Sequence, residues 1–207
     1  LAKIAGEKAG IIKPHTPVVI GETCTETSPV FETKAKAEDA PITFAEDLPE
    51  VISSEPCHDA KGGRNYVTRN FGSFHGELGG DYQTRNTNTI LCALRELNDP
   101  RITLDTIHKG FSTVSDSTGL TGRWQIINQH PLVICDTGHN VGGWQYLAPQ
   151  IKSIPCKQLR MVFGMVDDKD ISSVMTLLPK DAVYYWAQAT SRRAIPSSKV
   201  KDLGYQH

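Results

Sequence analysis

Hydrophobic residues in the second half of the chain form short continuous runs, and a stretch with helical spacing follows each of the first two. Along the chain these segments are the apolar run 131–135, the helical stretch 142–154, the apolar run 159–164, the helical stretch 170–178 and the apolar run 182–187. Strands that alternate with helices are typical of βαβ units with a parallel sheet, and unbroken apolar runs indicate strands covered on both faces. From about residue 124 onward we therefore expect a mostly parallel sheet flanked by helices, with the strand that starts near Pro131 at its centre.

The first half of the chain has shorter and more varied elements. The expected elements are a helix over 1–8, a strand over 18–22, a helix over 28–40, a strand over 41–45, a loop over 46–65, a strand over 66–71, and helices over 87–97 and 104–113. Residues 118–122 read as a boundary, which predicts two α/β domains, 1–118 and 119–207. The chain opens inside a helical pattern and ends without a closing strand, so we expect a fragment of a longer protein.

Composition and charge argue against several classes of protein. Hydrophobic residues make up 39% and charged residues 22%, which is typical of a globular protein with a real core. The net charge of -1 gives no support for nucleic-acid binding, and no apolar run is long enough to cross a membrane. The five cysteines contain no C-x-x-C pair, which argues against a zinc site or a disulfide framework and favours free thiols in the cytoplasm. The sequence does not determine the oligomeric state, and we expect a monomer.

Polar residues directly follow the apolar runs, and parallel sheets bind ligands at the carboxyl ends of their strands. Asp136, His139 and Asn140 come after the run that ends at Cys135. They offer a carboxylate, an imidazole and an amide to a ligand. Asp136 and Asn140 are also typical helix-capping residues, and the residues alone leave both interpretations open. Further polar clusters follow the next two runs, over 164–170 and 188–194.

Other candidate binding residues precede this half of the chain. Arg123 follows Gly122 at the expected domain boundary, where an arginine can hold an anionic group through bidentate contacts. Neither a G-x-G-x-x-G pattern nor a G-x-x-x-x-G-K-[ST] pattern occurs in the chain. A phosphate-cradling loop is therefore missing from this sequence.

The order of motifs along the chain resembles the folylpolyglutamate synthase/dihydrofolate synthase family, which is related to the Mur ligases. The matching segments are Glu7-Lys8-Ala9-Gly10-Ile11-Ile12-Lys13-Pro14 (E-K-A-G-I-x-K-P), Gly80-Asp81-Tyr82-Gln83-Thr84-Arg85-Asn86 (G-x-H-Q-x-x-N), Gly122-Arg123 (G-R), Asp136-Thr137-Gly138-His139-Asn140 (D-x-A-H-N) and Gly164 to Asp170 (G-x-x-x-D-K-D). Each motif is weak alone, but together, in this order, they are specific. The resemblance implies a Rossmann-like C-terminal domain, preceded by the tail of a central ATPase-like domain.

The resemblance also implies an activity and a set of site residues. Members of the family join glutamate to folate or dihydropteroate, using ATP and Mg²⁺ to form an acyl phosphate that the amine attacks. By this similarity Asn86, Arg123 and Asp136 would contact ATP, while His139 and Ser191 would lie near the incoming glutamate. Lys8 matches a lysine that family members carry as a carbamate, which would make it an oxygen ligand for the metal.

Some positions depart from the family pattern. Tyr82 stands in place of a histidine, Gly138 in place of an alanine and Val141 in place of a proline. Because the family's phosphate-binding loop would precede Leu1, we expect this chain to be inactive by itself. A different interpretation is a non-catalytic nucleotide- or anion-binding α/β module that uses residues 136–140 as its receptor site.

Overall fold

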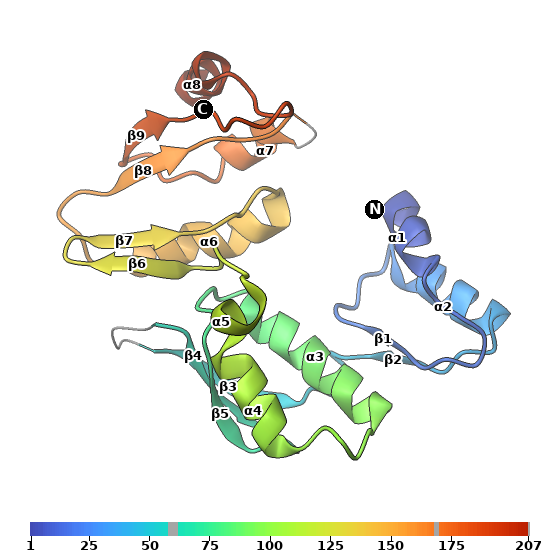
Figure 1. Ribbon diagram of the computed structural model, residues 1–207. Coiled ribbons are helices and arrows are strands. Elements are labelled where there is room, and N and C mark those ends of the chain that lie inside the picture. Colours follow the sequence, from blue (N-terminus) through green and yellow to red (C-terminus); the bar gives the residue numbers. More distant parts are fainter. Residues whose placement is uncertain (58–61, 168–169, 207) are drawn as a thin grey trace. The chain divides into compact units, whose positions relative to one another are not determined.

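The computed structural model describes residues 1–57, 62–167 and 170–206, which form two compact units (Figure 1). The first unit is Leu1–Thr121 and the second is Gly122–His207. The sequence places its domain boundary between residues 118 and 119, and the units divide after Thr121. In the described part of the chain, no helix combines the length and the apolar character needed to span a membrane.

The N-terminal part of the first unit is a small α/β layer. Two helices accompany a pair of parallel strands, namely α1 (Ala2–Ala9), α2 (Ser28–Ala37), β1 (Val18–Ile20) and β2 (Ile42–Phe44). Small side chains such as Ala9 and Ala35 are buried in this layer, where they allow α1 and α2 to approach closely, and Phe31 packs against them. The elements expected over 1–45 are therefore confirmed.

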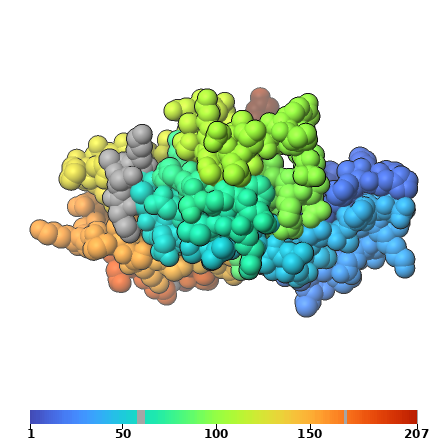
Figure 2. All heavy atoms as spheres, turned by 90° about the horizontal axis from the view of Figure 1, so that it is seen from below, coloured from blue at the N-terminus to red at the C-terminus, as the bar shows by residue number. Residues whose placement is uncertain are grey.

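The remainder of the first unit is an antiparallel sheet covered by helices. The strand order is β3-β4-β5, and the elements are β3 (Val51–Pro56), β4 (Arg64–Thr68), β5 (Ser73–Gly76), α3 (Gln83–Leu97), α4 (Leu104–Ser112) and α5 (Val114–Thr118). The core contains Tyr66, Phe74, Leu91 and Ile107, and the rings of Tyr66 and Phe74 lie 5.3 Å apart. Figure 2 shows the atoms of the β4–β5 region in close packing with those of α4.

The prediction of a loop over 46–65 is wrong for residues 51–56 and 64–65, which belong to strands. β3 occupies 51–56 and β4 begins at Arg64. β3 is an edge strand with mostly exposed side chains, and its Ser, Glu and Pro residues are typical of loops, which is why the sequence did not indicate a strand. The helix expected over 87–97 begins earlier, at Gln83, so that Asn86 belongs to its first turn.

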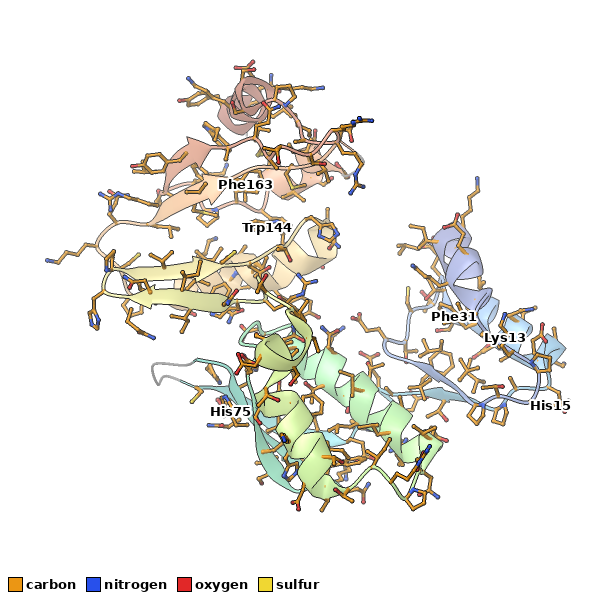
Figure 3. The ribbon with its side chains drawn as sticks, in the orientation of Figure 1. Lys13, His15, Phe31, His75, Trp144 and Phe163 are labelled. Atoms are coloured by element: carbon orange, nitrogen blue, oxygen red, sulfur yellow. The ribbon has the colours of Figure 1, made fainter. Side chains whose placement is uncertain are left out.

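In its described residues, the second unit combines two strand pairs with three helices. Its elements are β6 (Gln125–Gln129), β7 (Leu132–Cys135), α6 (Val141–Ser153), β8 (Arg160–Phe163), α7 (Ile171–Met175), β9 (Val183–Trp186) and α8 (Ser197–Gln206). The ring of Phe163 packs edge-on against Trp144 of α6 at 5.8 Å and against Trp186 at 6.1 Å (Figure 3). This aromatic group joins α6 to the parallel pair β8–β9.

The expected α/β class is confirmed, but the position of one strand is not. β8 and β9 are parallel, whereas β7 pairs antiparallel with β6 and with no other strand among the described residues. The prediction of a central strand near Pro131 was therefore wrong. β6 escaped prediction because Gln125, Asn128 and Gln129 make it polar, and the short connection through Pro131 places it beside β7.

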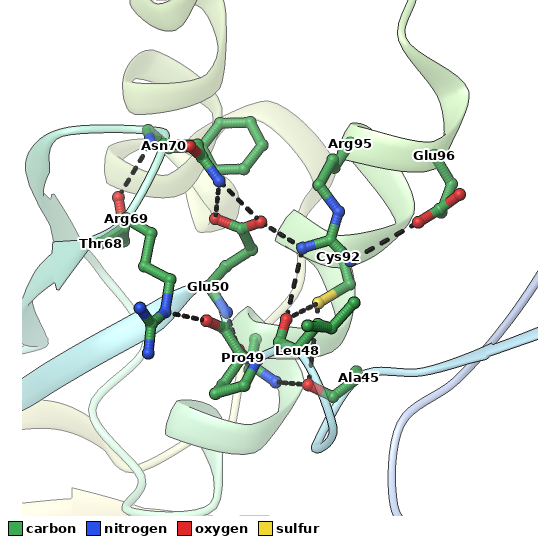
Figure 4. A network of polar contacts seen from close by, with 12 residues as sticks. Ala45, Leu48, Pro49, Glu50, Thr68, Arg69, Asn70, Cys92, Arg95 and Glu96 are labelled. Atoms are coloured by element: carbon green, nitrogen blue, oxygen red, sulfur yellow. Dashed lines mark hydrogen bonds and ion pairs between the residues drawn. The ribbon is translucent and has the colours of Figure 1, made fainter.

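A buried carboxylate ties several elements of the first unit together (Figure 4). The side chain of Glu50 is fully buried and accepts hydrogen bonds from Arg95 of α3 and from Asn70 Nδ2 at 3.0 and 3.1 Å. The backbone N–H of Glu50 donates to Asn88 Oδ1 at 2.8 Å, and Asn88 Nδ2 donates to the Ala45 carbonyl. This network fixes the segment between β2 and β3 against α3.

Candidate functional site

Two segments of the second unit meet at the carboxyl end of β7. Asp136, which directly follows this strand, accepts the backbone N–H of Trp124 at Oδ2 and that of Gly138 at Oδ1, each at 2.7 Å. The Thr137 N–H donates to the Gly122 carbonyl at 2.9 Å. The half-buried carboxylate therefore holds the segment before β6 against the loop that leads into α6.

The backbone of the first segment needs a glycine. Gly122 has a φ of 69°, in the left-handed region that side chains other than glycine rarely adopt. A Cβ on Gly122 would also lie 2.7 Å from the Thr137 methyl carbon. Trp124 has a φ of 52°, and such unfavourable conformations in non-glycine residues often mark functional sites. The backbone conformation and the close Thr137 methyl group thus explain why the residue before Arg123 is a glycine.

Arg123 is held beside this junction. Its Nη1 donates to the hydroxyl oxygen of Thr137 and, at 3.4 Å, to the Gly122 carbonyl. Neither acceptor is an ion. The positive charge of this half-buried guanidinium is therefore not neutralised by these two bonds, which suits an anionic ligand such as a phosphate.

His139 has one ring nitrogen engaged by the same loop. Its Nδ1 lies 3.0 Å from the Thr137 carbonyl oxygen. Because a carbonyl only accepts hydrogen bonds, Nδ1 carries the proton in this contact. In the neutral imidazole Nε2 is then the acceptor, on a side chain that is exposed. His139 can therefore accept a hydrogen bond from a ligand when neutral, or donate one when charged.

Of the two candidate caps of α6, Asn140 caps the helix and Asp136 does not. Asn140 is the N-cap of α6, because its Oδ1 accepts the Gly143 N–H at 2.8 Å. Asp136 instead binds Trp124 and Gly138 and does not cap α6. A Cβ at position 138 would overlap Leu147 Cδ1, so an alanine there would require the Leu147 side chain to shift.

Ser191 lies beyond the end of β9. Its Oγ accepts the Arg193 N–H at 3.3 Å, and the Arg193 carbonyl accepts the Asp167 N–H at 2.9 Å. The segments after β8 and β9 are therefore joined by backbone bonds. Within the described ranges, no hydrogen bond joins Ser191 to His139. Residues 168 and 169 of the Gly164–Asp170 motif lie outside those ranges.

Asn86 and Lys8 belong to the first unit. Asn86 is exposed in the first turn of α3, and its Nδ2 donates to the buried Gln83 Oε1 at 3.0 Å. Lys8 is exposed in the last turn of α1. Across the part of the chain that the structure describes, no group of three or more His, Cys, Asp or Glu side chains could hold a metal ion.

The residues that support the predicted site residues could not be recognised from the sequence. The buried Arg64 donates to Asp81 Oδ1 at 2.5 Å and to Ser54 Oγ at 2.8 Å, which anchors the loop before α3. Thr137, which occupies an unspecified position of its motif, contacts Arg123, His139 and Gly122.

A cavity of about 750 Å³ lies between α6 and residues 176–181. None of the predicted site residues lines it, so it is not part of the candidate site.

Comparison with known proteins connects these features to a family. Residues 122–205 match the family described as Mur ligase, glutamate ligase domain. The dihydrofolate synthase/folylpolyglutamate synthase of Bacillus subtilis (strain 168) is 28% identical over 189 residues, 86% of this chain and 42% of that protein. The protein of the same name from Escherichia coli (strain K12) is 34% identical over 102 residues, 49% of this chain and 23% of that protein.

Solved structures share the fold of the whole chain. Folylpolyglutamate synthase of Mycobacterium tuberculosis complexed with ADP aligns with a TM-score of 0.81 and 22% identity over 99% of this chain and 46% of that chain. E. coli FolC in complex with DHPP and ADP aligns with a TM-score of 0.72 and 23% identity over 99% of this chain and 46% of that chain. This chain thus spans less than half the length of the relatives it matches. Most of the second unit thus matches the glutamate ligase domain of the Mur ligases, and the chain as a whole is similar in sequence and fold to dihydrofolate synthase/folylpolyglutamate synthases.

Proposed function

We propose that this chain is part of an ATP-dependent ligase that adds glutamate to folate or dihydropteroate through an acyl phosphate. The observation that carries the proposal is the junction of residues 122–124 with residues 136–140, which brings Arg123, Asp136 and His139 together in a glutamate ligase domain. The first unit is then the tail of the central domain. One related structure holds DHPP and ADP and another holds Mn, AMPPNP and L-glutamate, which supports the choice of substrates.

The residues of this chain divide between the two substrates. ATP supplies the phosphoryl group that converts the folate carboxylate into an acyl phosphate, from which the glutamate amine displaces phosphate. Arg123 would hold the anionic part of ATP, with Asn86 and Asp136 as further contacts. His139 and Ser191 would position glutamate, and the exposed edge of the His139 ring can bond to the amine or to a carboxylate.

Lys8 is proposed as a metal ligand in its carbamylated form only. The described residues of this chain offer no acidic or histidine cluster that would complete a Mg²⁺ site, so the other ligands must come from elsewhere in the ligase. No step that we assign to this chain depends on the metal. The five free cysteines agree with a reducing compartment, and we infer a cytoplasmic location.

In the full-length ligase, replacing His139 or Arg123 by alanine is expected to raise the KM for one substrate only. His139→Ala should raise the KM for glutamate with little change in the KM for ATP, and Arg123→Ala should do the reverse. Each loss should be about tenfold or more in kcat/KM, because a hydrogen bond to a charged group contributes roughly 1.5–3 kcal/mol. Steady-state kinetics with each substrate varied in turn would measure both, and each variant serves as the control for the other. Unchanged glutamate kinetics in His139→Ala would leave that histidine with a structural role only.

The isolated chain is expected to bind ATP weakly. It carries no phosphate-cradling loop, so affinity should be on the order of 1 mM, about -4 kcal/mol. Isothermal calorimetry with ATP and with adenosine would measure it, and Arg123→Ala should reduce binding of ATP more than that of adenosine. Micromolar binding of ATP would contradict this division of contacts.

The coding sequence upstream of Leu1 separates the ligase from the non-catalytic binding module. A phosphate-binding loop encoded there would support the ligase, whereas an unrelated domain would favour the binding module.

A further inference from the structure

Thr137 is the residue through which the two proposed substrate contacts are connected. Its hydroxyl accepts a hydrogen bond from Arg123 Nη1 and donates one to the Gly122 carbonyl at 3.1 Å. Its carbonyl oxygen lies 3.0 Å from His139 Nδ1. One residue therefore contacts the arginine assigned to ATP and the histidine assigned to glutamate.

The two contacts use different parts of Thr137. A hydroxyl can donate and accept at once, and here both capacities are used within the 122–124 segment. The contact to His139 uses only the backbone, which any residue at position 137 provides. The side chain should therefore matter for Arg123 and not for His139.

We propose that Thr137 is a positioning residue, whose hydroxyl sets the direction of the Arg123 guanidinium and whose carbonyl fixes the tautomer of His139. The proposal rests on the proposed function only for the identity of the ligands. Within the described residues, the Arg123 guanidinium donates hydrogen bonds only to the Thr137 hydroxyl and, at 3.4 Å, to the Gly122 carbonyl. Loss of the hydroxyl should leave the guanidinium free to rotate into solvent.

Two substitutions separate the hydroxyl from the rest of the side chain. Thr137→Val keeps a methyl group over Gly122, where contact is close, and replaces the hydroxyl with a second methyl. Thr137→Ser keeps the hydroxyl and loses the methyl. If the hydroxyl is the active group, Thr137→Ser should behave like the unaltered chain and Thr137→Val should not.

The first test is nitrogen-15 NMR of this chain, with Arg123→Lys used to assign the guanidinium signals. We expect slow rotation of Arg123 in the unaltered chain and in Thr137→Ser, and signals averaged as in an exposed arginine in Thr137→Val. The His139 shifts should report a proton on Nδ1 in all three. If Thr137→Val disturbs both residues, Thr137 only supports the loop, and if it disturbs neither, the hydroxyl has no role. Either result would overturn the proposal.

The second test is kinetic and uses the full-length ligase. Thr137→Val should raise the KM for ATP about tenfold, leave the KM for glutamate unchanged, and be rescued by Thr137→Ser. If the NMR result is as expected while Arg123→Ala and Thr137→Val both leave ATP kinetics unchanged, the assignment of Arg123 to ATP fails and the positioning by Thr137 stands. If Arg123→Ala raises the KM for ATP and Thr137→Val does not, the positioning role fails and the proposed function stands.

Discussion

Glu50→Gln is expected to lower the free energy of unfolding of the first unit by about 3 kcal/mol, since it removes the charge of a buried carboxylate that accepts hydrogen bonds from two side chains. The Glu50 side chain is fully buried, and its carboxylate accepts from both Arg95 and Asn70. An amide in its place would turn one N–H group toward these donors and remove the negative charge. Burial alone would lower the pKa of Arg95, but the hydrogen bond to Glu50 and the nearby charges together outweigh this and hold the pKa above its ordinary value.

The control for this variant is Glu96→Gln. Glu96 also lies near Arg95, at 3.5 Å, but its side chain is 32% exposed, so its loss should cost at most about 0.5 kcal/mol. Amide hydrogen exchange would measure both changes locally. Peptides from α3 and β4 should lose protection in Glu50→Gln only, while peptides from α6 and β8 serve as an internal reference. Equal effects of the two variants would show that the buried network does not stabilise the unit.

Phe163→Ala is expected to destabilise the second unit by about 3–5 kcal/mol, which is typical of truncating a buried aromatic side chain. Phe163 is 6% exposed and lies between Trp144 and Trp186, so alanine would leave a cavity where α6 meets β8. All three tryptophans of the chain belong to this unit. Urea unfolding followed by tryptophan fluorescence therefore reports on the second unit directly.

Val162→Ala provides the matched control from the neighbouring position. Val162 points to the other face of β8 and is 78% exposed, so truncating it should change stability by less than about 0.5 kcal/mol. The urea midpoint should fall clearly in Phe163→Ala and stay nearly constant in Val162→Ala. A similar fall in both would mean that the stability of β8 does not depend on which face is buried.

The sequence indicated elements whose pattern is local and missed features that depend on distant partners. The apolar runs of β8 and β9 and the spacing of α6 were sufficient to predict these elements. β6 and β3 were missed because their polar residues suit an edge strand, which is recognised only when its partner is known. The same distinction applies to the site: Asp136 and His139 stood out within one motif, whereas Trp124 as the partner of Asp136 depends on the folded chain.

The segments around Asp136 are held together by hydrogen bonds within the chain itself. Both oxygens of this carboxylate already accept backbone N–H groups, so the loop conformation forms when the unit folds. Immobilising a side chain on binding opposes association by about 0.5–1.5 kcal/mol. Here the conformational entropy of residues 122–124 and 136–138 is lost during folding instead. A ligand that binds this conformation therefore meets a surface that the chain's own hydrogen bonds hold in place.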